Sequence, residues 1–261
     1  MSQIFDFTHA ILRRPGASVV KGLRAGGGAD PDFEDVLAEH AGYGAALVEA
    51  GLALTMLDPL EDFPDAIFVE DPALVFSEGA IVLHPGAASR AGEGAFLRPA
   101  LEAHFDSVLD LPQGNADGGD VLVMPDKALI GLSARTDAAG AEALIAVLAQ
   151  LGIRAEVAAT PPEVLHLKTA SSLLDEETVL STRALAATGI FAGYRVIEVP
   201  LGEEGGANVL RVNDRVLAGA GYPRILDALD AHGLKVVTLP NSAIAAIDAG
   251  FTCMSLRWRT A

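Results

Sequence analysis

The sequence predicts an α/β fold in which about five copies of one small unit close into a ring. A helical pattern followed by a short β-type run recurs roughly every 40 to 55 residues, and paired short strands lie between these units. Because repeated units must bury their inner faces against their neighbours, this pattern favours a five-bladed α/β-propeller with pseudo-fivefold symmetry. An ordinary doubly wound α/β sheet is the alternative, and it would require longer helices and fewer hairpins.

The individual elements follow from the residue pattern. Apolar residues at helical spacing predict helices at 32–50, 91–104, 136–151, 184–190 and 223–232. Short apolar runs predict the strands that follow them at 52–57, 107–111, 153–158, 194–199 and 234–239. The paired strands include 66–76 with 80–84, 121–124 with 128–132, and 209–212 with 215–218. The last pair is joined by Asn213 and Asp214, which are favoured hairpin residues.

The composition indicates one globular domain. The chain has 261 residues, of which 51% are hydrophobic and 20% charged, so it can form a full core and is not a disordered protein. No linker or low-complexity segment suggests a boundary, and we expect a single domain over residues 1–261. No apolar run reaches the roughly 18 to 20 residues that a membrane helix requires. The absence of a signal-peptide pattern and the single cysteine predict a cytoplasmic protein.

The net charge restricts the class of partner. The chain has 35 acidic and 18 basic residues and a formal net charge of −17. Such a surface repels phosphate backbones and anionic membranes, so we expect neither nucleic acid nor a membrane as a partner. It raises the local concentration of cationic small molecules, which makes a positively charged substrate the better match.

Cys253 is the one cysteine of the chain and a candidate nucleophile. A single cysteine forms neither an intramolecular disulfide nor a thiolate cluster, so its chemistry is limited to covalent catalysis or redox sensing. The alternative is packing, because free cysteines are among the most buried residues and most are inert. Catalysis would need a histidine nearby and a group that orients it.

Two segments supply candidates for these partners. His166 is a polar ring among apolar neighbours in Val164-Leu-His-Leu-Lys-Thr169, a pattern that is also typical of a histidine held in the core by a backbone carbonyl. Asp117 and Asp120 flank a Gly-Gly pair immediately before a predicted strand. Glycines let the backbone approach closely at such a position, although Asp and Gly are also common in plain turns.

Three acids stand in the otherwise apolar run Asp65-Ala-Ile-Phe-Val-Glu-Asp-Pro72. Burying an unpaired carboxylate costs several kcal/mol. We therefore expect Asp65, Glu70 and Asp71 either to face solvent on a sheet edge or to meet a cation. A guanidinium is the sharper alternative, because its fork of N–H donors matches carboxylates.

We expect no resident metal or other cofactor. Cys253, His166 and Asp117 are the candidate metal ligands, but no His/Cys pair has close metal-binding spacing. The same three side chains could bind zinc and thereby lose activity, so zinc is expected only as an inhibitor. The run Gly26-Gly-Gly28 precedes the first helix and is a candidate for a loop that moves over a site.

Eight segments, taken in order, resemble the dimethylarginine dimethylaminohydrolases. They are Phe7-Thr-His-Ala10, Phe63-Pro-Asp-Ala-Ile-Phe-Val-Glu-Asp-Pro72, His84-Pro-Gly-Ala-Ala-Ser-Arg90, Asp117-Gly-Gly-Asp120, Gly131-Leu-Ser-Ala-Arg-Thr136, Leu165-His-Leu-Lys-Thr169, Gly221-Tyr-Pro-Arg224 and Thr252-Cys-Met-Ser-Leu256. The resemblance spans nearly the whole chain, and it is the joint order and spacing that make it specific. It implies the five-bladed α/β-propeller, or pentein, fold of guanidine-modifying enzymes, and it is compatible with a homodimer.

The resemblance also implies a role for each matching residue. Cys253 matches the nucleophile, His166 the general acid and base, and Asp117 the carboxylate that orients His166. Some bacterial relatives carry glutamate where this chain has Asp117, so the reach to His166 is shorter here. Asp65, Glu70 and Asp71 match the acids that hold the guanidinium and ammonium groups of the substrate. Arg90 and Arg135 match the arginines that bind the substrate carboxylate. Leu23 matches a lid residue, and Ile247 matches a position whose backbone contacts the substrate.

The function implied is hydrolysis of asymmetric dimethylarginine and monomethylarginine to citrulline and an amine, through an S-alkylthiouronium on Cys253. A related hydrolase or deiminase for arginine, citrulline or another guanidino or ureido amino acid is the alternative, because a pocket discriminates one methylene by only about 1–3 kcal/mol. A non-catalytic binding module of the same fold is a third interpretation. The joint retention of Cys253, His166, Asp117 and both arginines argues against it.

Overall fold

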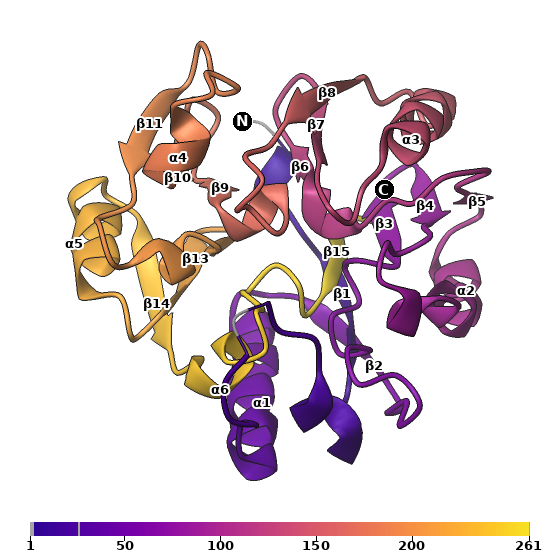
Figure 1. The fold of residues 1–261 in the computed structure, drawn as a ribbon, viewed down its shortest axis with the longest axis horizontal. Helices are drawn as coiled ribbons and strands as arrows, with labels where there is room; N and C mark the ends of the chain where they lie inside the picture. The colour runs from indigo at the N-terminus through magenta and orange to yellow at the C-terminus, as the bar shows by residue number, and fades with distance from the viewer. Residues whose placement is uncertain (1–2, 26, 261) are drawn as a thin grey trace.

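The computed structural model describes residues 3–25 and 27–260, and in it five three-stranded sheets surround a central axis (Figure 1). The sheets are β1 (His9–Arg13) with β2 (Ala53–Leu57) and β15 (Leu256–Trp258); β3 (Ala73–Phe76), β4 (Gly79–Val82) and β5 (Val108–Asp110); β6 (Val121–Val123), β7 (Ala128–Leu132) and β8 (Ala155–Ala159); β9 (Ser171–Leu173), β10 (Thr178–Ser181) and β11 (Arg195–Glu198); and β12 (Leu210–Val212), β13 (Arg215–Gly219) and β14 (Lys235–Leu239). In every sheet the middle strand pairs antiparallel with one neighbour and parallel with the other. The predicted five-bladed propeller is confirmed.

In each blade a helix connects the middle strand to the strand parallel to it and lies on the outside of the ring (Figure 1). These helices are α1 (Phe33–Glu49), α2 (Glu93–His104), α3 (Ala138–Gln150), α4 (Arg183–Ala186) and α5 (Pro223–Ala231), and α6 (Ser242–Ala245) precedes β15. Side chains fix some of the starts: Asp32 accepts hydrogen bonds from the first-turn amides of α1, and Asp137 does the same for α3. Short 3₁₀ helices are η1 (Gln3–Phe5), η2 (Ala17–Lys21), η3 (Ala88–Arg90), η4 (Gly118–Asp120), η5 (Leu167–Thr169) and η6 (Glu204–Gly206).

The ring is closed by the two ends of the chain. The C-terminal strand β15 pairs antiparallel with β1, with Trp258 opposite His9. Trp258 is 2% exposed and its ring contacts those of His9, His104 and Phe105 at centroid distances of 5.4, 5.0 and 4.9 Å. The first blade therefore exists only when residues about 250 positions apart in sequence have come together.

Two predicted elements differ from the structure. The segment 66–76 is a strand only from Ala73 onward, and 65–71 is a series of turns whose carbonyls at Asp65 and Phe68 accept hydrogen bonds from the Arg90 guanidinium at 3.2 and 2.9 Å. A buried cation from a distant segment thus replaces the strand pairing that the apolar pattern predicts. The helix predicted at 184–190 ends at Ala186, and turns follow as far as Gly193, with Gly189 at a positive φ of 78°.

No helix among residues 3–25 and 27–260 is both long enough and apolar enough to cross a membrane.

We expect Trp258→Ala to destabilise the protein by about 3–5 kcal/mol, because it removes a buried ring from the strand that closes the first blade. Urea unfolding followed by circular dichroism measures this loss. Leu201→Ala is the control, because Leu201 is 80% exposed and should change stability by less than about 0.5 kcal/mol. Equal midpoints for the two variants would show that closure through β15 adds little stability.

Candidate active site

Four of the candidate site residues lie in the segments that lead into the innermost strands of four blades. Asp71 precedes β3, Asp117 precedes β6, His166 precedes β9, and Cys253 precedes β15. Because these strands all line the central axis, the segments before them converge at one end of it. Side chains from distant parts of the sequence are therefore brought to one place by the ring itself.

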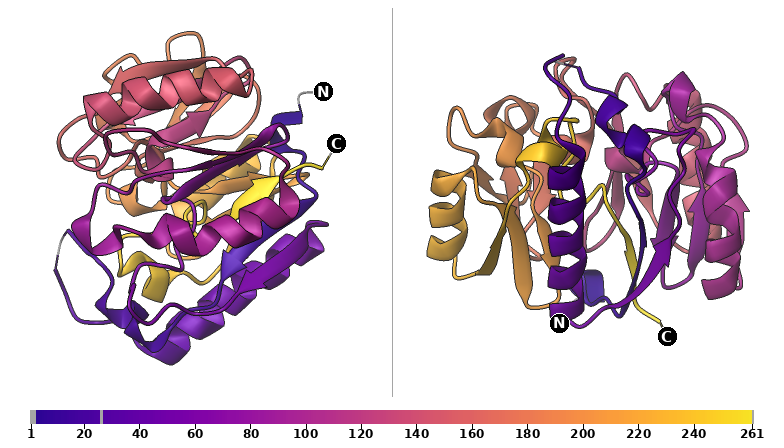
Figure 2. Two further views of the ribbon diagram at one scale, coloured as in Figure 1. Left: turned by 90° about the vertical axis from the view of Figure 1, so that its right-hand side faces the viewer. Right: turned by 90° about the horizontal axis from the view of Figure 1, so that it is seen from below.

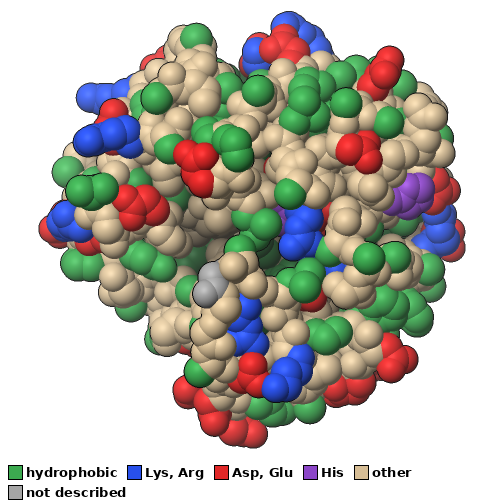
Figure 3. Space-filling model, viewed as in Figure 1, with side chains coloured by type: hydrophobic (Ala, Val, Ile, Leu, Met, Phe, Trp, Pro, Cys, Tyr) green, Lys and Arg blue, Asp and Glu red, His purple; other side chains and the backbone are tan. Residues whose placement is uncertain are grey.

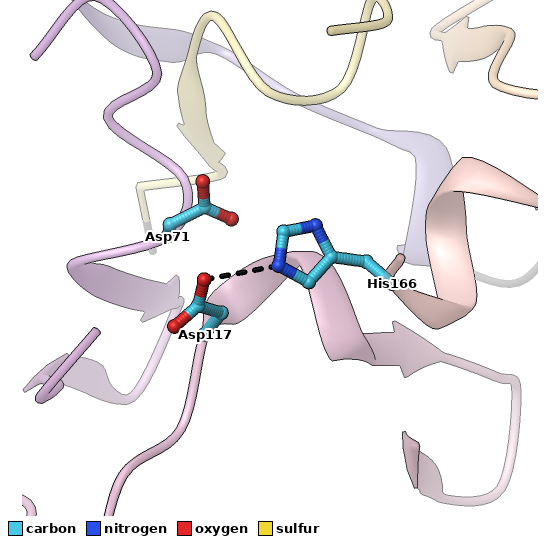
Figure 4. Close-up of side chains that lie close together, drawn as sticks. All are labelled: Asp71, Asp117 and His166. Carbon is cyan, nitrogen blue, oxygen red and sulfur yellow. Dashed lines mark hydrogen bonds and ion pairs between the residues drawn. The ribbon is translucent and has the colours of Figure 1, made fainter. Parts of the chain in front are cut away.

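His166 and Asp117 form a buried hydrogen-bonded pair (Figure 4). The Nε2–H of His166 donates to Oδ2 of Asp117 at 2.9 Å, and the other ring nitrogen, Nδ1, points away from Asp117. Burial alone lowers the pKa of His166, but the negative charge of Asp71 and the hydrogen bond to Asp117 outweigh it and raise this pKa to about 9. His166 is consequently protonated at neutral pH, with Nδ1–H available as a proton donor.

Asp117 and Asp120 are held in place from behind. Asp117 is fully buried, and its Oδ1 accepts the amide of Gly86 at 2.7 Å. Asp120 accepts the hydroxyls of Ser133 and Thr136 and the amide of Leu167, next to His166, so it fixes the segment that carries the imidazole. Burial raises the pKa of Asp120, because a buried carboxylate is costly to keep charged.

The Gly-Gly pair between these aspartates is required by close approach. A Cβ on Gly119 would lie 2.9 Å from Oδ1 of Asp71 and 2.9 Å from Cγ of His166, and a Cβ on Gly118 would lie 2.0 Å from the carbonyl oxygen of Glu70. Real Cβ atoms do not come this near to other atoms. The glycines therefore allow the imidazole and the Asp71 carboxylate to pack directly on the backbone.

Arg90 is the buried counter-ion of the site. Its guanidinium forms an ion pair with Asp71, and its Nε–H and Nη2–H groups donate to Glu93 at 3.0 and 2.7 Å. With the two carbonyl contacts described above, these bonds leave one N–H of Nη1 for a further acceptor. Burial raises the pKa of Glu93, whereas for Asp71 the charges of Arg90 and His166 outweigh burial and lower the pKa.

Cys253 is a neutral thiol in this environment. Burial, followed by the negative charges of Glu70 and Asp71, raises the pKa of Cys253 to about 12. The ordinary value is about 8.5, so the structure stabilises the protonated form and a thiolate needs additional positive charge nearby. The carbonyl of Cys253 accepts the amide of Glu70 at 3.2 Å, which anchors the backbone beside the thiol.

One cavity joins most of the predicted site residues. It is lined by Leu23, Asp65, Phe68, Asp71, Arg90, Arg135, Leu165, His166, Ile247, Asp248, Ala249 and Cys253. It lies at the centre of the ring, and Figure 3 shows a hollow near the middle of this face with basic and hydrophobic side chains at its rim. Its free volume is about 40 Å³, little more than the ~30 Å³ share of one water molecule.

Two predicted site residues do not line this cavity. Asp117 lies behind His166 and acts on it from there. Glu70 points to the other side of the backbone, where it forms ion pairs with Lys168 at 2.6 Å and Arg257 at 3.3 Å and accepts the Thr252 hydroxyl at 2.7 Å. Sequence reasoning grouped Glu70 with Asp71 because they are adjacent, but the two side chains face opposite ends of the ring.

Four lining residues were not predicted: Phe68, Leu165, Asp248 and Ala249. Each lies within a few residues of a predicted site residue, which is the only signal that the sequence offers for them. Asp248 also has a positive φ of 57°, unusual for a residue other than glycine, and accepts the amide of Ala25. Asp65 accepts the amide of Leu23 at 2.9 Å, so two acids at the cavity hold the segment Leu23–Ala25 across it.

Part of the proposed lid lies outside the described residues. Gly26 is not described, and Gly27 and Gly28 have φ angles of +67° and +110°.

Ligand atoms of Asp71, Asp117 and His166 lie within 4.8 Å of one another. Among the described residues, the set that could hold a metal thus contains Asp71 in place of Cys253. Zinc as an inhibitor stays a prediction.

The fold and the site together place the chain among the pentein enzymes that act on guanidines. The profile of the arginine deiminase family matches residues 57–204. A dimethylarginine dimethylaminohydrolase of Pseudomonas aeruginosa is 36% identical over 254 residues, 97% of this chain and 100% of that protein, and one of Streptomyces coelicolor is 33% identical over 96% of each chain. The chain belongs to the dimethylarginine dimethylaminohydrolase family.

Solved structures give the same result. The Pseudomonas aeruginosa enzyme, as a cysteine-to-serine variant complexed with citrulline, matches with a TM-score of 0.94 and 36% identity over 97% of this chain and 100% of that one. The N-terminal domain of ArgZ, described as an arginine dihydrolase, matches with a TM-score of 0.85 at 17% identity over 97% of this chain and 98% of that one. The second likeness is evidence for the fold alone.

We expect Asp117→Asn to lower the pKa of His166 from about 9 by one unit or more, because it removes one charge and weakens the hydrogen bond to Nε2. Histidine proton chemical shifts followed from pH 5 to 11 measure this pKa, and exposed Asp106→Asn is the control. The wild-type pKa lies above the unfolded value of about 6.5, so the stability contributed by the charged ring is complete below about pH 6.5 and is lost as pH rises through about 9. An unchanged pKa in Asp117→Asn would contradict this assignment.

Proposed function

We propose that the protein hydrolyses Nω-methylated L-arginine to L-citrulline and dimethylamine or methylamine. The observation that carries this proposal is the charge around the thiol. Asp65 and Asp71 are buried carboxylates that line the cavity together with Asp248 and the cationic groups Arg90, Arg135 and His166. Three further buried carboxylates support this wall from outside the cavity: Glu93 binds Arg90, Asp117 binds His166, and Asp120 accepts the amide of Leu167. Burial raises the pKa of Asp65 as well, so the site retains acids that a bound cation would stabilise.

A guanidinium is the cation that matches these acids and the thiol. Its carbon is the electrophile, and its planar N–H groups match carboxylates such as those of Asp65 and Asp71. A cation bound beside Cys253 opposes the causes that raise the thiol pKa and favours the thiolate. The proton then leaves to solvent, since His166 already carries one at neutral pH. The nucleophile is thus activated by the substrate that it attacks.

The steps that follow use His166 first as an acid and then as a base. The thiolate of Cys253 adds to the guanidinium carbon, and Nδ1–H of His166 protonates the dimethylamino nitrogen, so the C–N bond breaks and an S-alkylthiouronium remains. Neutral His166 removes a proton from water, whose oxygen adds to the same carbon. The C–S bond then breaks to return the thiolate, and the product loses its remaining proton to become the ureido group of citrulline. No cofactor takes part.

The remaining polar groups would bind the amino-acid end. Among the described residues Arg135 has no side-chain hydrogen bond or ion pair, and Arg90 has one N–H left, so both have donors for a carboxylate. Phe68, Leu165 and Ile247 supply apolar wall for the methylene chain. The free volume of the cavity is small, so we propose that the segment with Leu23 moves when substrate enters.

Arginine, citrulline or another guanidino or ureido amino acid is the second candidate substrate class, since these molecules share the groups that the acids and arginines contact. We also propose that the protein acts in the cytoplasm, where a single unpaired cysteine remains reduced. The homodimer rests on the resemblance alone and stays a prediction.

We expect the purified protein to release citrulline and the matching amine from asymmetric dimethylarginine and monomethylarginine faster than citrulline from arginine. Product quantification by mass spectrometry with separate substrates, including agmatine, tests this preference. Cys253→Ser should abolish turnover while circular dichroism stays unchanged, because no nucleophile remains. Faster turnover of arginine than of dimethylarginine would overturn the substrate, and activity retained in Cys253→Ser would overturn the nucleophile.

We expect Arg135→Ala to reduce kcat/KM for dimethylarginine about 10- to 100-fold, because a charged hydrogen bond to a carboxylate contributes about 1.5–3 kcal/mol. The decarboxylated analogue of the same substrate should lose much less. Steady-state kinetics with both compounds separate carboxylate binding from a general disturbance of the site. Exposed Arg183→Ala, on α4, is the matched control, and equal losses with both substrates would remove Arg135 from carboxylate binding.

A further inference from the structure

A second and larger cavity runs along the propeller axis from the end opposite the active site. Its volume is about 250 Å³, and it is lined by the innermost strands of all five blades, β3, β6, β9, β12 and β15, and by the N-terminal segment 4–7. Figure 2 shows both chain ends on one side of the molecule and α6 with the loop before α1 on the other. Asp6 and Arg259, near these ends, line the cavity, so its mouth opens away from the active site.

At the base of this axial cavity two cationic side chains share one carboxylate. Lys168 and Arg257 both form ion pairs with the single carboxylate of Glu70, at 2.6 and 3.3 Å. Lys168 is 8% exposed, and it lines this cavity and not the one at Cys253. Among residues 3–25 and 27–260, Glu70 is the only partner of its ammonium group, which leaves two of three N–H donors for an acceptor.

The walls above this base are largely apolar. The lining strands carry Phe76, Leu122, Leu173 and Trp258. The guanidinium carbon of Arg211 lies over the ring of Phe5, 4.7 Å from the centroid of that ring. A cavity of about 150 Å³ already holds benzene, so 250 Å³ accommodates a ligand of six to ten or so heavy atoms. The overall charge of −17 makes an inward-facing cationic base unusual for this chain.

We propose that the axial cavity is a second binding site, for a small monocarboxylate with an apolar body. Its carboxylate accepts hydrogen bonds from Nζ of Lys168, and the net charge of the Lys168–Glu70–Arg257 group changes from +1 to zero on binding. The apolar body lies against the strands named above. This site is independent of the substrate proposed for the other end of the axis.

The test is isothermal titration with hexanoate, with hexylamine as a probe of equal length and opposite charge. Wild type is expected to bind one hexanoate and no hexylamine. Lys168→Met should weaken hexanoate binding about tenfold or more, since it removes a charged donor. Arg135→Ala should leave the binding unchanged, because Arg135 lines only the active-site cavity. No hexanoate binding, equal binding of hexylamine, or loss of binding in Arg135→Ala would overturn the proposal.

A second variant keeps the test decisive if Lys168→Met does not fold. Ser77 is exposed in the turn between β3 and β4 and lines the mouth of the cavity, so Ser77→Trp should block entry without disturbing the core. Val48→Trp is the matched control, because Val48 is 56% exposed on α1 and does not line the cavity. Loss of hexanoate binding in Ser77→Trp alone is the expected result. Undiminished binding in a folded Ser77→Trp would refute the axial site.

Discussion

The buried ion pair of Arg90 with Asp71 and Glu93 is the interaction on which the active-site end of the ring depends. Asp71 and Glu93 are buried carboxylates, and an unpaired buried charge costs several kcal/mol. Arg90 offsets the charges of these two acids and also binds the carbonyls of Asp65 and Phe68. The turns that aim Asp65 and Asp71 into the cavity, and the acids themselves, are therefore stabilised by the same guanidinium.

The charge that remains after this compensation sets the resting state of the catalytic groups. The same acids raise the pKa of His166 to about 9 and contribute to the rise of the Cys253 pKa to about 12. The imidazole is thus kept charged and the thiol neutral. An enzyme that relied on His166 to deprotonate Cys253 would need the opposite arrangement, with a neutral base beside the thiol. A cationic substrate removes the need for such a base, because its charge lowers the pKa of the thiol, as well as that of the imidazole, when it binds.

The sequence predicted the repeat of helix and following strand well because each copy of it is local. The helix and the strand after it lie within one continuous segment, so periodicity and turn residues are enough to place them. The pairing of β1 with β15 joins the two ends of the chain and leaves no local pattern, and the turns at 65–71 depend on Arg90, which lies about 20 residues further on. Interactions of this kind cannot be predicted from periodicity.

The site shows the same division between what is local and what is not. Cys253, His166 and Asp71 could be proposed from residue type and resemblance, and all three line one cavity. The same means could not show that Glu70 and Asp71 face different sides. The side that each of two adjacent turn residues faces depends on the backbone conformation, which residue type and resemblance do not give. The structure places the Glu70 carboxylate between Lys168 and Arg257, on the side of the Cys253 segment that faces the axial cavity.

The two cavities on the axis are separated by backbone segments whose residues line both of them. Glu70 accepts the hydroxyl of Thr252, the residue before Cys253, while the amide of Glu70 donates to the Cys253 carbonyl. Lys168 stands two residues after His166. Cys253 and His166 are therefore held on one face of a polar network whose other face is the base of the axial cavity. The position of the thiol depends on both faces, because the same backbone segments carry the catalytic side chains and the buried ion pairs behind them.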